Sequence, residues 1–347
     1  KNLSRSLVYP ICKLFNKILV TRSLPKVWKQ SFVIPILKSP PKNDVKNYRP
    51  ISLTCPLSKL FEIIISDKIL GHLNEHKLLS PKQFGFLKGK STSSQLVLAY
   101  KEIADSLDQR ALFQTEAIFL DFSKAFDTVP HRLLIHKLKG CGICSNIRAF
   151  VEEFLSSRTF RVSFDGSFSS AFHSSSGVPQ GSILGPILFT IYINDLAKIT
   201  LTSPAASIWL FADDVKILFK LPINDPLATK LALENAQKDL QEVEKWAKTW
   251  ELTLSESKST QFSTGKLQIS LKVNNTSLSS PNSDLVVKDL GVYLSPPLSF
   301  GYHIEKICLK ASYSTSRILK SIINPNIKTY RRCFISYVRP ILEYASI

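Results

Sequence analysis

Two adjacent carboxylates inside an apolar segment constrain this chain more than any other feature. Asp213 and Asp214 follow the apolar run 208–212 and precede the largely apolar run 215–219. Short apolar runs on both sides of a two-residue break predict a β-hairpin with the two acids at its tip. Because neighbouring carboxylates repel each other and are partly desolvated at a sheet surface, a divalent cation would stabilise the arrangement.

A third acid extends this pattern. Asp121 ends the apolar run 117–120, which reads as a buried strand. Mg²⁺ prefers hard oxygen ligands, and two such ions about 4 Å apart activate an attacking hydroxyl and stabilise a leaving pyrophosphate. Three carboxylates from two strands suit that chemistry. The alternative is that Asp213 and Asp214 only mark a turn and that Asp121 caps a helix before Ser123.

The charge of the chain points to a polyanionic partner. Its 347 residues include 45 Lys plus Arg against 27 Asp plus Glu, which gives a formal charge of +18. This excess favours nucleic acid or an anionic membrane surface. Because the apolar stretch 183–193 falls short of the roughly 20 residues needed to cross a bilayer, we expect no membrane span.

Methionine and cysteine usage bear on the origin of the chain. The sequence begins at Lys1 and contains no Met, which predicts a segment of a longer reading frame. Six cysteines are few for this length, so we expect reduced thiols and an intracellular protein. Cys141 and Cys144 have the spacing of zinc ligands, but no second pair accompanies them, and a loop is the preferred interpretation.

The first 43 residues have nine Lys or Arg and no acid. We interpret this segment as a basic extension of the domain, although an organellar transit peptide has a similar composition. Five prolines, Pro10 among them, predict that no long amphipathic helix forms here.

Hydrophobic periodicity predicts helices and strands in a mixed order. Helices are expected at 56–76, 91–108, 226–250 and over most of the last 45 residues. The first of these has an apolar stripe, formed by Leu57, Leu60, Phe61, Ile64 and Ile65. Strands are expected at 117–120, 160–164, 208–221, 267–273 and 285–294, with a turn at Asp165-Gly166. Because no regular βαβ repeat appears, we predict an α+β fold.

Five segments carry a resemblance to a known family. FLDFSKAFD at 119–127 resembles motif A of reverse transcriptases from LINE-type (non-LTR) retrotransposons, and SGVPQGSILGP at 176–186 resembles motif B. FADD at 211–214 resembles motif C, where the family usually has Tyr before Ala-Asp-Asp. YRPISL at 48–53 and QFGF at 83–86 resemble the upstream fingers motifs. The segments follow the family's order and spacing over nearly the whole chain.

The resemblance implies a right-hand polymerase fold with fingers, an antiparallel-sheet palm and a partial helical thumb. We expect residues 1–115 to form an N-terminal extension and the fingers, 116–300 the palm with motifs A to E, and 301–347 the start of a truncated thumb. Asp121, Asp213 and Asp214 would be the catalytic metal ligands. The backbone carbonyl of Phe122 would help to hold two Mg²⁺ ions, with Mn²⁺ as the alternative.

Three residues match the family's nucleotide pocket. Phe126 stands at the steric-gate position, where a bulky ring collides with a ribose 2′-hydroxyl and selects dNTPs; its alternative role is core packing. Gln180 and Gly181 match pocket residues, although Pro-Gln-Gly also describes an ordinary turn.

Two basic residues match positions near the triphosphate. Arg49 corresponds to a fingers residue that contacts the incoming triphosphate, and a guanidinium fork suits phosphate oxygens. The alternative is that it is one of many surface basic residues. Lys258 corresponds to a motif D lysine that could protonate the pyrophosphate, and Ser255 stands where the family commonly has Asn.

The implied function is that of an RNA-directed DNA polymerase domain from a non-LTR retroelement. It would transfer nucleotides from dNTPs to the 3′-hydroxyl of a DNA primer on an RNA template. Family analogy adds a nuclear location and fusion to an endonuclease domain outside this segment. Two alternatives stay open: a decayed or domesticated copy that binds nucleic acid without polymerising, and an RNA-dependent RNA polymerase, against which Phe126 argues.

Overall fold

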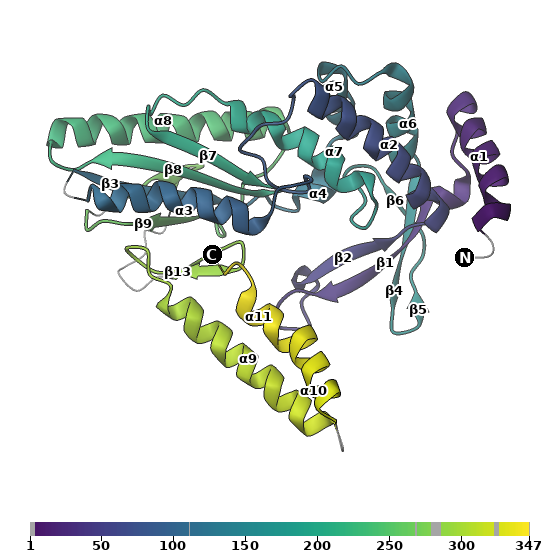
Figure 1. The fold of residues 1–347 in the computed structure, drawn as a ribbon. Coiled ribbons are helices and arrows are strands. Elements are labelled where there is room, and N and C mark those ends of the chain that lie inside the picture. Colours follow the sequence, from purple (N-terminus) through teal and green to yellow (C-terminus); the bar gives the residue numbers. More distant parts are fainter. Residues whose placement is uncertain (1–3, 111, 268, 279–285, 323–325, 347) are drawn as a thin grey trace. The chain divides into compact units, whose positions relative to one another are not determined.

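The chain forms two compact units whose segments interleave along the sequence. The computed structural model describes residues 4–110, 112–267, 269–278, 286–322 and 326–346 (Figure 1). The first unit comprises residues 1–86, 122–199 and 245–253, and the second comprises residues 87–121, 200–244 and 254–347. This grouping by contacts is a different division from fingers, palm and thumb, whose predicted boundaries stay a prediction.

The first unit contains a mixed sheet with the strand order β2-β1-β4-β5, and β6 also pairs with β4. Its strands are β1 (Gln30–Leu37), β2 (Tyr48–Leu53), β4 (Arg158–Phe164), β5 (Ser167–Phe168) and β6 (Phe172–Ser174). β1 runs parallel to β4, and the other pairs are antiparallel. The predicted hairpin turn is confirmed, because Asp165 and Gly166 both have positive φ, as a type I′ turn requires.

Helices make up most of the remainder of the first unit. They are α1 (Ser4–Thr21), α2 (Pro56–Glu75), α4 (Ala125–Thr128), α5 (His131–Gly140), α6 (Ser145–Leu155) and α7 (Leu184–Ile193), with short 3-10 turns at Lys26–Lys29, Val45–Asn47 and Asn194–Lys198. α7 is buried along nearly its whole length and contacts both α2 and α5. The loop predicted at Cys141–Cys144 is confirmed between α5 and α6, and both thiols are free.

The expectation that prolines prevent a long N-terminal helix is wrong. Pro10 lies inside the 18-residue helix α1. A proline removes one backbone hydrogen bond from a helix interior, and tertiary packing compensates for that loss here. Phe15 and Ile18 are buried, and the Phe15 ring lies 4.7 Å from that of Phe61.

The predicted apolar stripe of α2 is only partly right. Phe61 and Ile65 are buried, but the other three members of the stripe are exposed, namely Leu57, Leu60 and Ile64. Glu62 lies on the buried side instead. Its Oε2 accepts hydrogen bonds from the backbone N–H groups of Ile183 and Leu184, at 2.8 and 3.2 Å, where α7 begins. A carboxylate suits the positive end of a helix dipole, and here that end is the start of α7. The buried face of α2 therefore includes Glu62 and differs from the face that the apolar residues alone predict.

The second unit is built on an antiparallel sheet with the strand order β7-β8-β3-β9. Its strands are β3 (Phe113–Leu120), β7 (Ala206–Phe211), β8 (Asp214–Pro222) and β9 (Thr260–Ser263). The helix α3 (Thr92–Asp108) runs alongside this sheet, and so does the part of α8 (Pro226–Thr249) up to residue 244, which belongs to the second unit (Figure 1). Leu96 and Ile103 of α3 are fully buried, as are Ile118 and Phe219 of the sheet.

The C-terminal part of the second unit is mostly helical, as predicted. Its helices are α9 (Gly301–Ser321), α10 (Ile327–Cys333), a π-helical turn (Phe334–Val338) and α11 (Arg339–Glu343). Two small hairpins precede them, β10 (Lys272–Val273) with β11 (Thr276–Ser277) and β12 (Val287–Asp289) with β13 (Val292–Leu294). The strand predicted at 285–294 is therefore a hairpin, and the one at 267–273 is confined to β10; residues 268 and 285 lie outside the described residues.

Helices and sheets are mixed as the predicted α+β class requires.

None of the helices within the described residues is both long enough and apolar enough to cross a bilayer.

Candidate active site

The three predicted metal-binding carboxylates converge at one edge of the sheet in the second unit. β7 and β8 form the predicted hairpin, with Phe211 paired to Asp214 across the turn. Leu120 at the end of β3 pairs with Val215 of β8. The antiparallel register therefore places Asp121, one residue further along, opposite Asp214.

The electrostatics of this edge show negative charge that is not fully compensated. Asp214 is open to solvent at the hairpin, yet its pKa is raised to about 7. The largest cause is desolvation of the carboxyl by the surrounding protein, and the charges of Asp213, Asp121 and Asp289 contribute to the same rise. The Lys216 ammonium acts in the opposite direction. These carboxylates are therefore close enough to repel one another.

Lys258 forms an ion pair with one member of the triad. Its Nζ lies 3.1 Å from Oδ2 of Asp121. The backbone brings the two together, because Asp121 accepts a hydrogen bond through its carbonyl from the backbone N–H of Ser255, at 2.8 Å. The motif D lysine predicted from the sequence thus lies beside the triad.

The donor set suits a hard divalent cation in chemistry and charge. All three side chains offer carboxylate oxygens, which Mg²⁺ prefers, and the Lys258 ammonium already takes a cation's place beside Asp121. Across the described ranges, no three Asp, Glu, His or Cys side chains are gathered into a finished coordination shell. The three side chains suit a metal ion because they are carboxylates that repel one another. The structure does not hold them in a complete coordination shell.

Phe122 can take part only through its backbone. Its side chain is 2% exposed, and its ring lies 6.4 Å from that of Trp246 in the core of the first unit. This burial agrees with the predicted role for the carbonyl group alone.

The loop that carries Gln180 and Gly181 is fixed to β2 in the first unit. The backbone N–H of Ser52 donates to the carbonyl of Gln180 at 2.7 Å. Gly181 has φ +118°, and a Cβ built there would lie 2.3 Å from the Ser52 carbonyl oxygen. Only glycine allows this approach of the two backbones.

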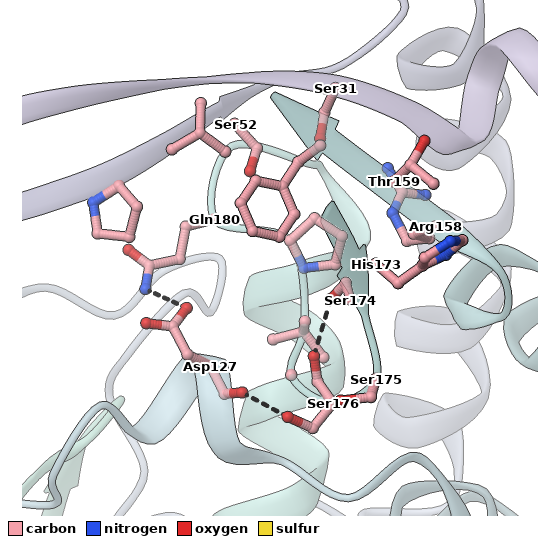
Figure 2. Close-up of a pocket in the computed structure, with 16 residues that line it drawn as sticks. Ser31, Ser52, Asp127, Arg158, Thr159, His173, Ser174, Ser175, Ser176 and Gln180 are labelled. Carbon is pink, nitrogen blue, oxygen red and sulfur yellow. Dashed lines mark hydrogen bonds between the residues drawn. The ribbon is translucent and has the colours of Figure 1, made fainter. Parts of the chain in front are cut away.

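A second contact joins the Gln180 side chain to the segment after motif A. Its Nε2 donates to Oδ1 of Asp127 at 2.9 Å (Figure 2). Burial raises the pKa of Asp127, while this hydrogen bond and the charge of Lys124 act to lower it. The Val178 N–H also donates to the Phe126 carbonyl, at 2.8 Å. Motifs A and B are therefore tied together around Phe126.

Phe126 is half-buried between two other rings. It stacks on Phe189 with ring centroids 4.3 Å apart, and Phe86 meets it edge-on at 6.1 Å. The packing role considered for this residue is therefore real, and its role as the steric gate stays a prediction.

Arg49 is exposed on β2, where it pairs with Ile36 of β1. Because side chains alternate along a strand, Arg49 lies on the opposite sheet face from Pro50 and Ser52, which line a pocket together with Gln180. The structure thus groups Gln180 and Gly181 with β2 but does not place the Arg49 side chain with them.

Sequence reasoning missed a buried ion pair near the triad. Lys216 and Asp289 are 3% and 5% exposed, and the Lys216 Nζ donates a hydrogen bond to Oδ2 of Asp289. A lysine inside the apolar strand 215–219 was the available signal. Its partner lies in a distant hairpin, and nothing in the local sequence identifies it.

The family comparison matches most of the chain. A family model described as reverse transcriptase (RNA-dependent DNA polymerase) matches residues 40–294, which include motifs A, B and C. The resemblance predicted from those motifs is confirmed.

Curated relatives come from insect mobile elements. The chain is 29% identical, over 98% of its length, to the probable RNA-directed DNA polymerase from transposon BS of Drosophila melanogaster. It is also 29% identical, over 95% of its length, to the RNA-directed DNA polymerase from mobile element jockey of the same species. It covers 38% and 36% of those two proteins.

Solved structures share the fold. An apo telomerase from Candida tropicalis, truncated from its C-terminal domain, matches with a TM-score of 0.53 at 12% identity, covering 79% of this chain and 54% of that one. Telomerase from the same organism in complex with a telomeric RNA fragment matches with a TM-score of 0.50 at 12% identity, covering 96% and 56%. Together with the family match, this likeness confirms the predicted right-hand polymerase fold.

Proposed function

Because this chain belongs to the reverse transcriptase family, we propose that it is the polymerase domain of a non-LTR retroelement, extending a DNA primer on an RNA template with dNTPs. The observation that carries the proposal is the convergence of Asp121, Asp213 and Asp214 at one sheet edge. These acids come from motifs A and C, inside the region that the family model matches.

The three carboxylates are the proposed ligands of two Mg²⁺ ions, with Mn²⁺ as the alternative, and the carbonyl of Phe122 is a further ligand. Bound metal ions supply activation of the primer hydroxyl and stabilisation of the leaving pyrophosphate. The chain itself supplies an edge where Asp214 is repelled by Asp213 and Asp121. A cation relieves that repulsion, which favours metal binding over an empty site.

Other residues are proposed to bind the nucleotide. Lys258, beside Asp121, donates a proton to the departing pyrophosphate. Phe126 excludes the ribose 2′-hydroxyl, and Gln180 with Gly181 forms a wall of the nucleotide pocket. Arg49 contacts the triphosphate from an exposed position that leaves its guanidinium accessible to an anion.

Further proposals concern the whole parent protein. The chain spans little more than a third of its curated relatives. We place fingers at 1–115, palm at 116–300 and the start of a thumb at 301–347, joined to an endonuclease elsewhere in the protein. We also propose an intracellular location, from the few cysteines, and a nuclear one by analogy with the family.

Primer extension tests the function. A DNA primer annealed to an RNA template should be extended with Mg²⁺ and dNTPs, and chelation of the metal should abolish extension. The double variant Asp213→Asn, Asp214→Asn should lose activity by at least about 10⁴-fold. Activity that survives in this variant would overturn the mechanism. A native chain that binds the hybrid but never extends it would support the alternative of a decayed copy.

The salt dependence of binding tests whether the positive charge of the chain holds nucleic acid. Because the chain contains 45 basic residues against 27 acidic ones, we expect its affinity for an RNA–DNA hybrid to fall by about 10³-fold or more between 50 and 200 mM salt. Filter binding at several salt concentrations measures this. A flat dependence would contradict binding through backbone phosphates.

A further inference from the structure

A buried ion pair in the second unit lies close to one of the proposed metal ligands. Lys216 follows Asp214 by two residues on β8, and its Nζ donates a hydrogen bond to Oδ2 of Asp289 at the end of β12. Both members of the pair are buried. A buried ion pair is weak evidence for stability, because desolvation of the two charges offsets their attraction. Stability alone therefore does not explain why the pair is present.

Lys216 and Asp214 share one face of the sheet. The pairing of β8 with β7 advances one residue at a time from Asp214 to Lys216, so the alternation of side chains holds here. Residues two apart on a strand point to the same face and lie about 7 Å apart. A lysine side chain is long enough to reach a carboxylate at that distance. The ammonium of Lys216 therefore has two carboxylates within its reach, one on β8 and one on β12.

The charges of both partners act on Asp214. The negative charge of Asp289 raises the pKa of Asp214, and the positive charge of Lys216 lowers it. The ammonium is thus near enough to affect this carboxylate, although its ion pair is with Asp289. An ammonium paired with Asp214 itself would compete with a metal ion for the same oxygens.

The surroundings of the ammonium explain what it would do without Asp289. Its Nζ lies 5.3 Å from the centre of the Tyr100 ring on α3 and 5.5 Å from that of the Phe119 ring on β3. These rings attract a cation less strongly than a carboxylate does. A buried charge that loses its partner is strongly unfavourable. The only acidic residue on β8 is Asp214, so this carboxylate is the alternative partner on the strand.

Asp289 is held in place independently of the lysine. It is the last residue of β12 and pairs with Val292 across a turn formed by Leu290 and Gly291. Both turn residues have positive φ, of 44° and 90°, as a type I′ turn requires. The Leu290 carbonyl also accepts a hydrogen bond from the Tyr344 hydroxyl, at 2.7 Å. The hairpin therefore offers a fixed carboxylate to which the lysine is tied.

We propose that Asp289 is a positioning residue, which holds the Lys216 ammonium away from Asp214 and so keeps that carboxylate free for a divalent cation. Asp289 acts through Lys216 and is not itself a metal ligand. The inference rests on the proposed metal site and adds to it a residue from a distant hairpin. Removing the Asp289 carboxylate alone releases the ammonium toward Asp214, whereas removing both charges leaves Asp214 without a competitor.

Mn²⁺ binding to the whole chain, measured from the electron paramagnetic resonance signal of the free ion, tests the proposal without nucleotide or nucleic acid. Asp289→Leu should weaken Mn²⁺ binding by at least about tenfold, because the metal must displace a charge-assisted hydrogen bond. Asp239→Leu is the matched control and should bind Mn²⁺ like the native chain. Asp239 is also a buried aspartate of the second unit, but its carboxylate accepts hydrogen bonds from Thr202 and Ser203. Equal affinities for the two variants would overturn the proposal.

A double variant separates the charge of Lys216 from the loss of the ion pair. In Lys216→Met, Asp289→Leu, both charges are replaced by apolar side chains of similar volume, a change that folds with buried ion pairs often tolerate. This variant should bind Mn²⁺ as tightly as the native chain. If it binds as weakly as Asp289→Leu alone, the ion pair only stabilises the hairpin, and the proposal is wrong.

A crystal structure of Asp289→Leu gives a readout that needs no metal. The Lys216 Nζ should lie within about 3 Å of a carboxylate oxygen of Asp214. An ammonium that keeps its native place beside the Tyr100 and Phe119 rings would contradict the proposal. Asp289→Asn keeps the shape of the side chain and should weaken Mn²⁺ binding in the same direction, so the test stands if Asp289→Leu does not fold.

The variant Asp213→Asn, Asp214→Asn distinguishes a failure of this proposal from a failure of the proposed function. If that variant loses Mn²⁺ binding while Asp289→Leu retains it, the metal site stands and the role of Asp289 is refuted. If that variant binds Mn²⁺ like the native chain, the metal site itself is wrong, and both proposals are refuted.

Discussion

The Lys258 ammonium lies 3.1 Å from Oδ2 of Asp121, so a lysine occupies one side of a proposed metal-binding carboxylate. Their side chains are 57% and 30% exposed, and ion pairs of this kind add little to stability. The value of the contact therefore lies in where it holds the ammonium. This place beside the triad is where the proposed protonation of a leaving pyrophosphate requires a donor.

Replacing this donor should slow the reaction without weakening the fold. We expect Lys258→Ala to lower kcat for nucleotide incorporation by about 10²-fold, in the range of lost general acids, with a much smaller change in KM. Rapid-quench single-nucleotide incorporation measures this. Lys266→Ala, an exposed lysine nearby in sequence, should leave kcat unchanged. A Lys258→Ala enzyme with the native kcat would remove the assignment.

Shortening Phe126 should relax sugar selection. We expect Phe126→Val to raise the ratio of NTP to dNTP incorporation by at least tenfold, about 1.4 kcal/mol of discrimination, because the ring no longer blocks the 2′-hydroxyl. Competition assays with both nucleotides give the ratio. The control is Phe189→Val, which removes the stacked partner but leaves the gate in place. An equal change in both variants would mean that packing alone sets the selectivity.

Gly181 should tolerate no side chain. Gly181→Ala places a Cβ against the Ser52 carbonyl in a backbone conformation that alanine avoids, so we expect a loss of about 2–4 kcal/mol in the free energy of unfolding. Gly71→Ala, in the exposed interior of α2 with open space around it, should instead gain about 0.5–1 kcal/mol. Urea unfolding compares them. Similar changes in the two variants would contradict the tight contact between the motif B loop and β2.

The buried Lys137 predicts a specific pH dependence of stability. Its ammonium pairs with Asp195 at 2.6 Å and lies 3.7 Å from the centre of the Trp250 ring. Burial lowers the pKa of Lys137 from 10.5 to about 8, although Asp195 acts to raise it. Between these two values the unfolded chain holds a proton that the folded chain has released, so stability rises with pH.

The contribution of Lys137 to this pH dependence can be isolated by subtracting the unfolding free energy of a variant that lacks the ammonium. The unfolding free energy of the native chain minus that of Lys137→Met should increase by about 2–3 kcal/mol between pH 7 and pH 10. Urea unfolding at four pH values supplies the two curves. A difference that stays constant across this range would show that Lys137 keeps its ordinary pKa when the chain is folded.

Much of the fold was predictable because it follows local periodicity. Apolar spacing predicted the ends of three helices to within a residue or two, namely α2, α3 and α8. It also predicted the hairpin that carries Asp213 and Asp214. The convergence of these acids with Asp121 was predictable too, since acids at the ends of apolar strands meet where the strands pair.

The remaining features depend on contacts between distant parts of the chain. Glu62 looks like a solvated helix residue until α7 places two backbone N–H groups beside it. Lys216 finds Asp289 73 residues later. Arg158 resembles every other basic residue until the surrounding strands bury it. No local pattern reports these tertiary contacts, and so the sequence alone could not identify them.

The interleaved path of the chain has a consequence for how such a gene decays. The polypeptide passes between the two units at residues 86, 121, 199, 244 and 253. A premature stop codon anywhere before residue 253 would remove part of both units, and only a truncation after that residue leaves the first unit whole. A copy truncated before residue 253 therefore keeps neither unit complete. Selection for either unit therefore requires an open reading frame through residue 253.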